Sequence, residues 1–162
     1  MSSIIRADKW QNALGVAYNA VLQVVSTTKT DTFTTSSTSM VDVTGLSVSI
    51  TPKFSSSKML IMFNALGGND TNNSVQYVNF VRDSTAIGQS TGGTTNNTIA
   101  VVNGDTNQSK FFSMHFLDSP STTSAVTYKI QMAVGSGSGS IGRRTATDNR
   151  SISTITVMEI AQ

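Results

Sequence analysis

The side chains that usually carry enzyme chemistry are few in this chain and lie far apart. His115 is the single histidine, Glu159 is the single glutamate, and cysteine is absent. A Ser-His-Asp triad needs a histidine oriented by a carboxylate, and glycoside hydrolysis needs two carboxylates that flank one bond. His115 lies among large apolar residues, and no G-x-S-x-G turn accompanies it. We therefore interpret His115 as a residue of a sheet face and predict no catalytic residue.

Metal and phosphate sites are also not indicated. The aspartates stand singly along the chain, and none begins the D-x-[DN]-x-[DN]-G pattern of a calcium-binding EF-hand. A calcium site in the loop near Asp70 stays open as an alternative. The stretch 135–140 is rich in glycine and serine but lacks the Gly-Lys-Ser/Thr ending of a phosphate-binding loop. We expect no metal and no cofactor.

The charge pattern argues against nucleic acid and membranes. The net charge is +2, and 12% of the residues are charged. Arg143, Arg144 and Arg150 form the one basic cluster, whereas nucleic-acid-binding proteins usually carry a dense basic stripe with interleaved aromatics. No apolar run approaches the length of a membrane span, and the first residues do not resemble a signal peptide. We expect no membrane insertion and a soluble protein made in a cytosol.

Serine and threonine are the most informative feature of the composition, because they account for 47 of the 162 residues. From residue 22 onward they alternate with apolar residues, as in strands that bury one face. The clearest runs are 46–51, 126–134 and 151–160, while 58–65 reads as a central strand. We expect the core to be formed by the strand faces around 111–117 and 126–134.

Turn residues divide the alternating pattern into eight to ten short strands without crossover helices. A turn is expected at Thr44-Gly45 and a tight hairpin at Asp83-Ser84. The predicted fold is all-β, an antiparallel β-sandwich of jelly-roll type. A strand at the C-terminus is typical of a jelly roll, in which the final strand lies in the middle of a sheet.

The polar loops between the strands are the candidate contact sites, because asparagine and threonine offer adaptable hydrogen bonds on a rigid scaffold. The expected loops are 67–74, 92–97 and 135–150. The residues that we predict to contact a receptor or a partner are Asn69, Asp70, Asn72, Asn73, Thr95, Asn96, Asn97, Arg143, Arg144 and Arg150.

The first 20 residues differ from the rest and contain Trp10, the only tryptophan. Ile5, Trp10 and Leu14 fall loosely at helical spacing, but Gly15 weakens a helix. We expect a short helix or an extended arm over 1–20, followed by a sandwich domain over 21–162. We predict that Ile5, Trp10 and Leu14 dock this arm on another subunit or a neighbouring protein; packing of Trp10 into its own domain stays open.

Four stretches of the sequence resemble a known family. They are VLQVVSTTKTDTFTTSSTSMVDVTGLSVSITPKFSSSKMLIMF, VRDSTAIG, SMHFLDSPSTTSAVTYKIQM and STITVMEIA, which together reach from about residue 21 to residue 161. They resemble a domain of tail-fibre and virion structural proteins in tailed bacteriophages, especially marine ones. The resemblance implies a β-sandwich, a homotrimer, and a place on the outside of a phage particle that is assembled in the host cytoplasm.

The function that we expect is therefore a non-enzymatic virion protein, a trimeric fibre or appendage in host-surface attachment. Its partners would be itself, other virion proteins of the capsid, tail or fibre, and a host surface glycan or outer-membrane protein. The short chain also fits a capsid decoration, cement or head-fibre protein, which is the alternative. A fibre-borne polysaccharide depolymerase would need carboxylates gathered in one cleft, which this composition barely supplies.

The assignment of strand faces can be tested at Tyr128. Replacing it by aspartate would place an unpaired charge on the face predicted to be buried, so Tyr128→Asp should lower the free energy of unfolding by several kcal/mol, on the order of a buried-charge penalty. Urea denaturation followed by circular dichroism measures this change. Wild-type stability in the variant would mean that the two faces of this strand are reversed.

Overall fold

The computed structural model describes residues 20–93, 95–106, 108–144 and 150–162. These residues form eleven β-strands. The strands are β1 (Val21–Lys29), β2 (Phe33–Thr35), β3 (Val41–Ile50), β4 (Lys58–Asn69), β5 (Ser74–Arg82), β6 (Thr85–Ile87), β7 (Ile99–Asn103), β8 (Lys110–Asp118), β9 (Val126–Val134), β10 (Gly139–Ile141) and β11 (Ser153–Ile160). The docking-arm residues Ile5, Trp10 and Leu14 lie outside the described residues.

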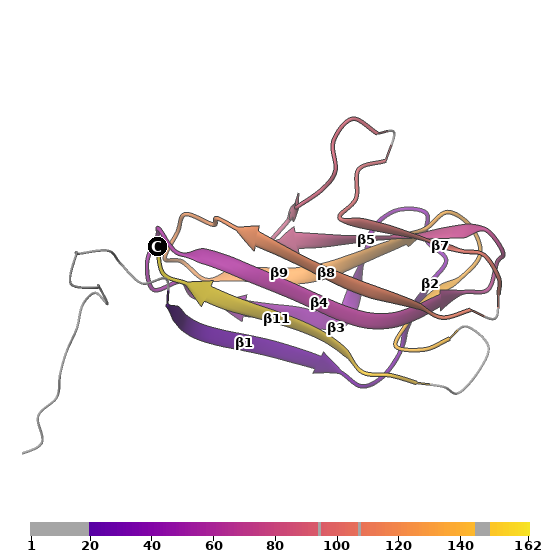
Figure 1. The fold of residues 1–162 in the computed structure, drawn as a ribbon, viewed down its shortest axis with the longest axis horizontal. Coiled ribbons are helices and arrows are strands. Elements are labelled where there is room, and N and C mark those ends of the chain that lie inside the picture. The colour runs from indigo at the N-terminus through magenta and orange to yellow at the C-terminus, as the bar shows by residue number, and fades with distance from the viewer. Residues whose placement is uncertain (1–19, 94, 107, 145–149) are drawn as a thin grey trace, which may run out of the picture.

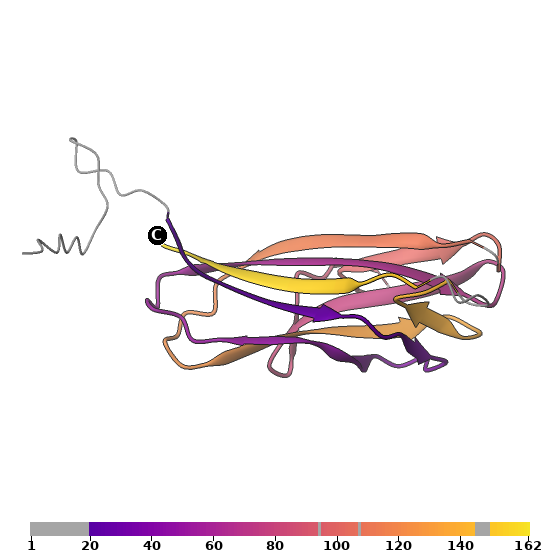
Figure 2. The ribbon, with the colours of Figure 1, turned by 90° about the horizontal axis from the view of Figure 1, so that it is seen from below.

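The strands build two antiparallel sheets that lie face to face (Figures 1 and 2). One sheet has the order β1–β11–β4–β8, with the short β10 and β2 beside the far end of β4. The other has the order β3–β9–β5–β7, with β6 beside the far end of β5. The final strand β11 lies between β1 and β4, so the all-β, jelly-roll-type sandwich predicted from the sequence is confirmed.

The core lies between the sheets and follows the period of two. Leu46, Val48 and Ile50 are at most 6% exposed, and Tyr128 is fully buried. From the facing sheet, β4 and β11 add apolar side chains at alternate positions, as do Phe112 and Met114 of β8. The buried set includes Met59, Ile61, Phe63, Ile130, Met132, Ile155 and Val157. The expected core faces of 111–117 and 126–134 are therefore confirmed.

The turn expected at Thr44-Gly45 is wrong, because β3 runs through these two residues without a break. The pairing of β3 with β9 shifts register between Asp42 and Ser47, and Gly45 has a φ of +81°. Between these two pairs β3 advances five residues and β9 two, so β3 accommodates three extra residues in a bulge, and glycine adopts positive φ at little cost. The Thr-Gly pair therefore bends a strand instead of ending it. By contrast, the hairpin at Asp83-Ser84 is confirmed, since Arg82 pairs with Thr85.

The Gly/Ser stretch after β9 is packed, although the sequence predicted a flexible loop. Its residues 139–141 form β10, which pairs with β4 on one side and with β2 on the other. A Cβ at Gly139 would lie 2.5 Å from the Met132 side chain, so only glycine lets β10 lie this close to the sheet. Residues 67–69, also expected in a loop, belong to β4 for the same reason, because they pair with β10.

A buried hydrogen-bonded group joins the two sheets at the end where β5 and β8 finish. The Tyr128 hydroxyl donates to Asp118 at 2.7 Å, and Nη1 of Arg82 donates to both Asp118 oxygens at 2.9 and 2.7 Å. Burial, followed by the hydrogen bond to Asp118, raises the pKa of Tyr128. Asp118 belongs to one sheet and its two partners to the other, so the group holds the sheets in register.

A second polar group closes the end of the sandwich where the chain enters β1 and leaves β11. The Glu159 side chain is fully buried and accepts hydrogen bonds from the Gln23 amide at 2.6 Å and the Lys53 backbone N–H at 2.7 Å. Burial alone would raise the pKa of Glu159. The surrounding hydrogen-bond donors outweigh burial and hold that pKa below its ordinary value.

The Glu159 group predicts a pH dependence of stability. A carboxylate whose pKa is lower in the folded than in the unfolded state stabilises the fold above the unfolded value of about 4.5, and this contribution is lost as pH falls through the folded value. At pH 7 we expect Glu159→Gln to cost about 1–3 kcal/mol, the range for a buried hydrogen bond to a charged group. Urea denaturation at several pH values should show that the difference in unfolding free energy between the wild type and Glu159→Gln becomes smaller below the pKa that Glu159 has in the unfolded chain. A difference that stays constant in acid would contradict the assignment.

Candidate functional site

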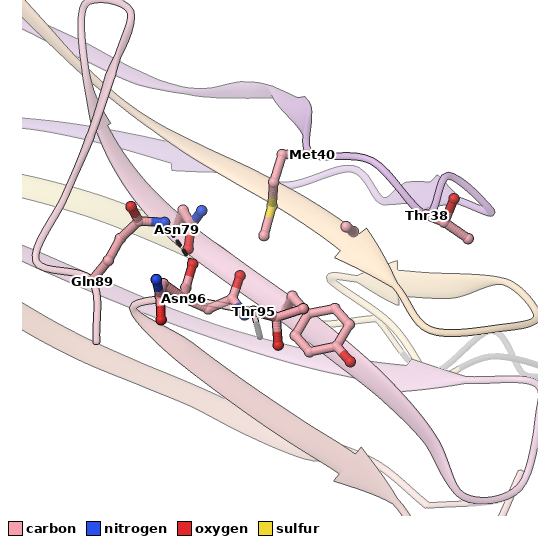
Figure 3. A pocket seen from close by; sticks show the side chains of 9 residues that line it. Thr38, Met40, Asn79, Gln89, Thr95 and Asn96 are labelled. Atoms are coloured by element: carbon pink, nitrogen blue, oxygen red, sulfur yellow. Dashed lines mark hydrogen bonds between the residues drawn. The ribbon is translucent and has the colours of Figure 1, made fainter. Parts of the chain in front are cut away.

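A shallow groove lies on the outer face of the β3–β9–β5–β7 sheet. Its volume is about 280 Å³. Tyr77 and Asn79 of β5 and Ala133 of β9 form its floor, because their side chains point away from the core. Its walls come from the segment before β3 and from the loop between β6 and β7, which projects from the sandwich (Figure 1). The wall residues are Thr38, Met40, Gln89, Thr95, Asn96 and Asn97 (Figure 3).

The β6–β7 loop is held over the sheet by hydrogen bonds at its base. The Thr98 backbone N–H donates to Oδ1 of Asn79 at 3.0 Å, and the Thr98 hydroxyl donates to the Ile87 carbonyl at 3.2 Å. The same hydroxyl accepts the Phe80 N–H at 3.1 Å. These bonds explain why Asn79 is only 3% exposed although it lies on an outer face. The base of the loop is thus part of the rigid sheet.

Two further hydrogen bonds cross the loop itself. The Gln89 amide donates to the Asn96 carbonyl at 2.7 Å, and the Ser90 N–H donates to the Asn97 carbonyl at 3.1 Å. These bonds use the backbone carbonyls of Asn96 and Asn97. Oδ1 of Asn96 also accepts the Gly93 N–H at 3.3 Å, whereas the Asn97 side chain is left to line the groove. In the described part of the chain, no hydrogen bond is made by the side chains of Tyr77 or Asn97.

The chemistry of the groove is that of binding. None of the nine lining residues is Asp, Glu, His, Lys or Arg; four side chains carry an amide and three carry a hydroxyl. Amides donate and accept hydrogen bonds at once, and the Tyr77 ring offers a flat apolar surface. No general base, nucleophile or ionised acid lies among the nine. The groove suits a neutral, polar ligand.

The other predicted contact loops gather at the end of the sandwich opposite the C-terminus (Figure 1). Asp70 Oδ1 accepts the Ser138 N–H at 2.7 Å, and Asn72 Oδ1 accepts the Thr106 N–H at 2.7 Å. Loops that are distant in sequence are thereby joined into one surface, which we call the loop end (residues 70–73, 104–106 and 135–138). Asn73 is exposed there, with a φ of 57°.

The prediction that Asn69 contacts a receptor or partner is wrong, because its side chain is fully buried. Its amide nitrogen donates to the Ser74 hydroxyl and to the Ser136 carbonyl, both at 3.1 Å, and its Oδ1 accepts the Thr71 N–H at 2.8 Å. Asn69 therefore holds the loop end together and presents nothing to a partner.

The three arginines lie between β10 and β11. Arg143 and Arg150 form an isolated antiparallel bridge through their backbones, and Nη2 of Arg143 donates to the Thr34 hydroxyl at 3.2 Å. Arg143 and Arg144 are partly buried, whereas Arg150 is exposed. None of the three lines the groove.

The other six of the ten predicted contact residues lie in two separate places. Thr95, Asn96 and Asn97 line the groove, whereas Asp70, Asn72 and Asn73 belong to the loop end. Sequence reasoning missed Tyr77 and Asn79, which form the groove floor. Their outward positions were available from the period of two in β5, but only the folded loop shows which outward residues are covered.

Comparisons with known proteins assign no family. No family model matches the sequence, and no curated protein matches it. Among solved structures, the chain is similar to the structure of infectious bursal disease virus Gx strain, with 12% identity, a TM-score of 0.45, and coverage of 96% of this chain and 44% of that one. For the VP2 subviral particle of infectious bursal disease virus, the values are 11%, 0.43, 96% and 43%. This chain spans less than half of either matched chain. We draw nothing about function from similarities of this size.

The described residues contain no group of three or more His, Asp or Glu side chains placed to hold a metal ion. Within the same residues, no helix has the length and apolar character that a membrane crossing requires.

Proposed function

We propose that this chain is a non-enzymatic structural protein of a bacteriophage particle, exposed on the particle as a trimeric fibre or appendage protein in host attachment. The four stretches that resemble phage virion proteins support the assignment. The β-sandwich that this resemblance implies agrees with the jelly-roll topology. The ionisable groups with buried contacts, such as Asp118 and Glu159, are used in holding the sandwich together, which also fits a structural protein.

The observation that carries the attachment role is the uncharged groove. Sugars present many hydroxyls and few charges, and proteins bind them with amide hydrogen bonds and aromatic stacking. Tyr77 of the sheet supplies an aromatic ring, and Gln89, Asn96 and Asn97 of the loop supply amide groups. We propose a neutral glycan of the host surface as the ligand of this groove, with the exposed loop end as a further contact surface.

The place on the particle can be tested on intact phage. Gold-labelled antibodies against the chain should decorate fibres or appendages at discrete positions, and electron microscopy measures where the gold lies. Gold spread evenly over the head would favour the alternative role, a capsid decoration or cement protein. Particles that bind no gold, although the antibody recognises the denatured chain from the same particles, would place the epitopes inside and contradict an exposed role.

The groove can be tested by binding of the purified chain to an array of neutral bacterial oligosaccharides. Tyr77→Ala and Asn97→Ala should each weaken binding roughly fivefold, because one net hydrogen bond or stacking contact is worth about 1 kcal/mol. Thr123→Ala, which removes an exposed polar side chain from the loop between β8 and β9, outside the groove, is the control and should bind like the wild type. Equal binding by all three variants would exclude the groove, and new reducing ends on the bound sugars would reveal a depolymerase.

A further inference from the structure

Apolar side chains that point away from the core lie side by side on the outer face of the β1–β11–β4–β8 sheet. The strand register places Val24 beside Met158, Met158 beside Leu60, and Leu60 beside Leu117. We call these four residues the apolar row, which crosses all four strands. Val24 is 52% exposed and Leu117 is 51% exposed, so both edges of the row face solvent.

Further apolar side chains extend the same face at both ends. Met62 lies next to the row on one side. On the other side of the row, Val21 pairs with Ile160. At the opposite end Phe111 pairs with Leu66 and is 81% exposed. Contiguous apolar surface of this kind is uncommon on a solvated monomer and marks an interaction surface.

The remaining outward positions of this face carry mostly hydroxyl and amide groups. Ser26 pairs with Thr156, Asn64 pairs with Ser113, and the imidazole of His115 lies beside Met62. Among the outward positions of β1, β11, β4 and β8, the one Lys, Arg, Asp or Glu residue is Lys58, which lies at the end of the sheet and donates to the Ser119 hydroxyl at 2.6 Å. A face without net repulsion can approach an identical face.

The other sheet shows how this chain builds a face that stays in water. On the outer side of β3 and β9, Lys129 and Gln131 both bind Asp42 at 2.7 Å, and the Ser49 hydroxyl lies 2.8 Å from the Thr127 hydroxyl. Charges and paired hydroxyls occupy the positions that Val24, Leu60 and Met158 occupy on the first sheet. Both sheets are antiparallel, so the difference between these parts of the two outer faces lies in side-chain chemistry.

We infer that a second copy of this chain packs on the outer face of the β1–β11–β4–β8 sheet, with the apolar row at the centre of the contact. Four strands about 4.8 Å apart and about eight residues long give a flat footprint of roughly 500 Å² before the relief of side chains is added. Two such faces together bury roughly 1,000 Å², which is about the least area that a specific interface takes, and the relief of the side chains adds to it. In the proposed trimer each copy would contribute this face.

The purified full-length chain tests the inference by light scattering at micromolar concentration. The wild type should give a multiple of the 17.1 kDa chain mass, and Val24→Glu should reduce the mass to that of one chain, because it places a charge in the contact. Val102→Glu is the matched control, since Val102 is 54% exposed in a strand on the outer side of the other sheet. A wild type of single-chain mass, or equal masses for the two variants, would overturn the inference.

A second measurement covers the case in which Val24→Glu does not fold. The chain has no cysteine, so Leu117→Cys and Val102→Cys each introduce one thiol at a similarly exposed site. Maleimide labelling of Leu117→Cys should be slower at micromolar than at nanomolar chain concentration, while labelling of Val102→Cys should not change. Equal behaviour of the two thiols would contradict the inference.

Discussion

Burial of apolar side chains between two sheets is the constraint on which the rest of this structure depends. Each strand gives the core one face, and a fully buried Phe, Ile or Met contributes about 1.5–3 kcal/mol relative to an exposed one. Phe63, Phe80 and Ile130 are fully buried in this layer. The polar groups around Asp118 and Glu159 lie at one end of it, where both residues pair with Met59, and they join strands that the core has already brought together. Because the core takes one face of every strand, the other face is left free for function.

The two outer faces carry different side chains. On β5 and β9 the outward residues include polar ones such as Tyr77 and Asn79, and the β6–β7 loop covers part of them to form an uncharged groove. On β1, β11, β4 and β8 the outward residues include the apolar row. One face thus suits a neutral polar ligand and the other a protein surface. A particle protein that binds both its neighbours and a host would need the same division between its two sides.

Local pattern predicted most of the strands, and it failed where pairing decides the conformation. The alternation over 126–134 identified the buried set that includes Tyr128 and Ile130, because a strand's side-chain period is independent of its partners. Gly45 was expected in a turn, and residues 139–141 were expected in a flexible loop. Glycine allows a turn, a bulge or a close strand contact equally well, and only the neighbouring strand selects among them.

The sequence by itself determined the fold class, the strand faces and the core, since these follow from the period of apolar residues and the absence of crossover segments. It also indicated Thr95, Asn96 and Asn97 as loop residues that could bind. Tertiary structure alone placed these side chains beside Tyr77 and Asn79, buried Asn69, and aligned Val24, Met158, Leu60 and Leu117 in one row. Strands far apart in sequence meet in a register that no local pattern contains. A groove or an apolar row made from several strands therefore exists only once the sheets have formed.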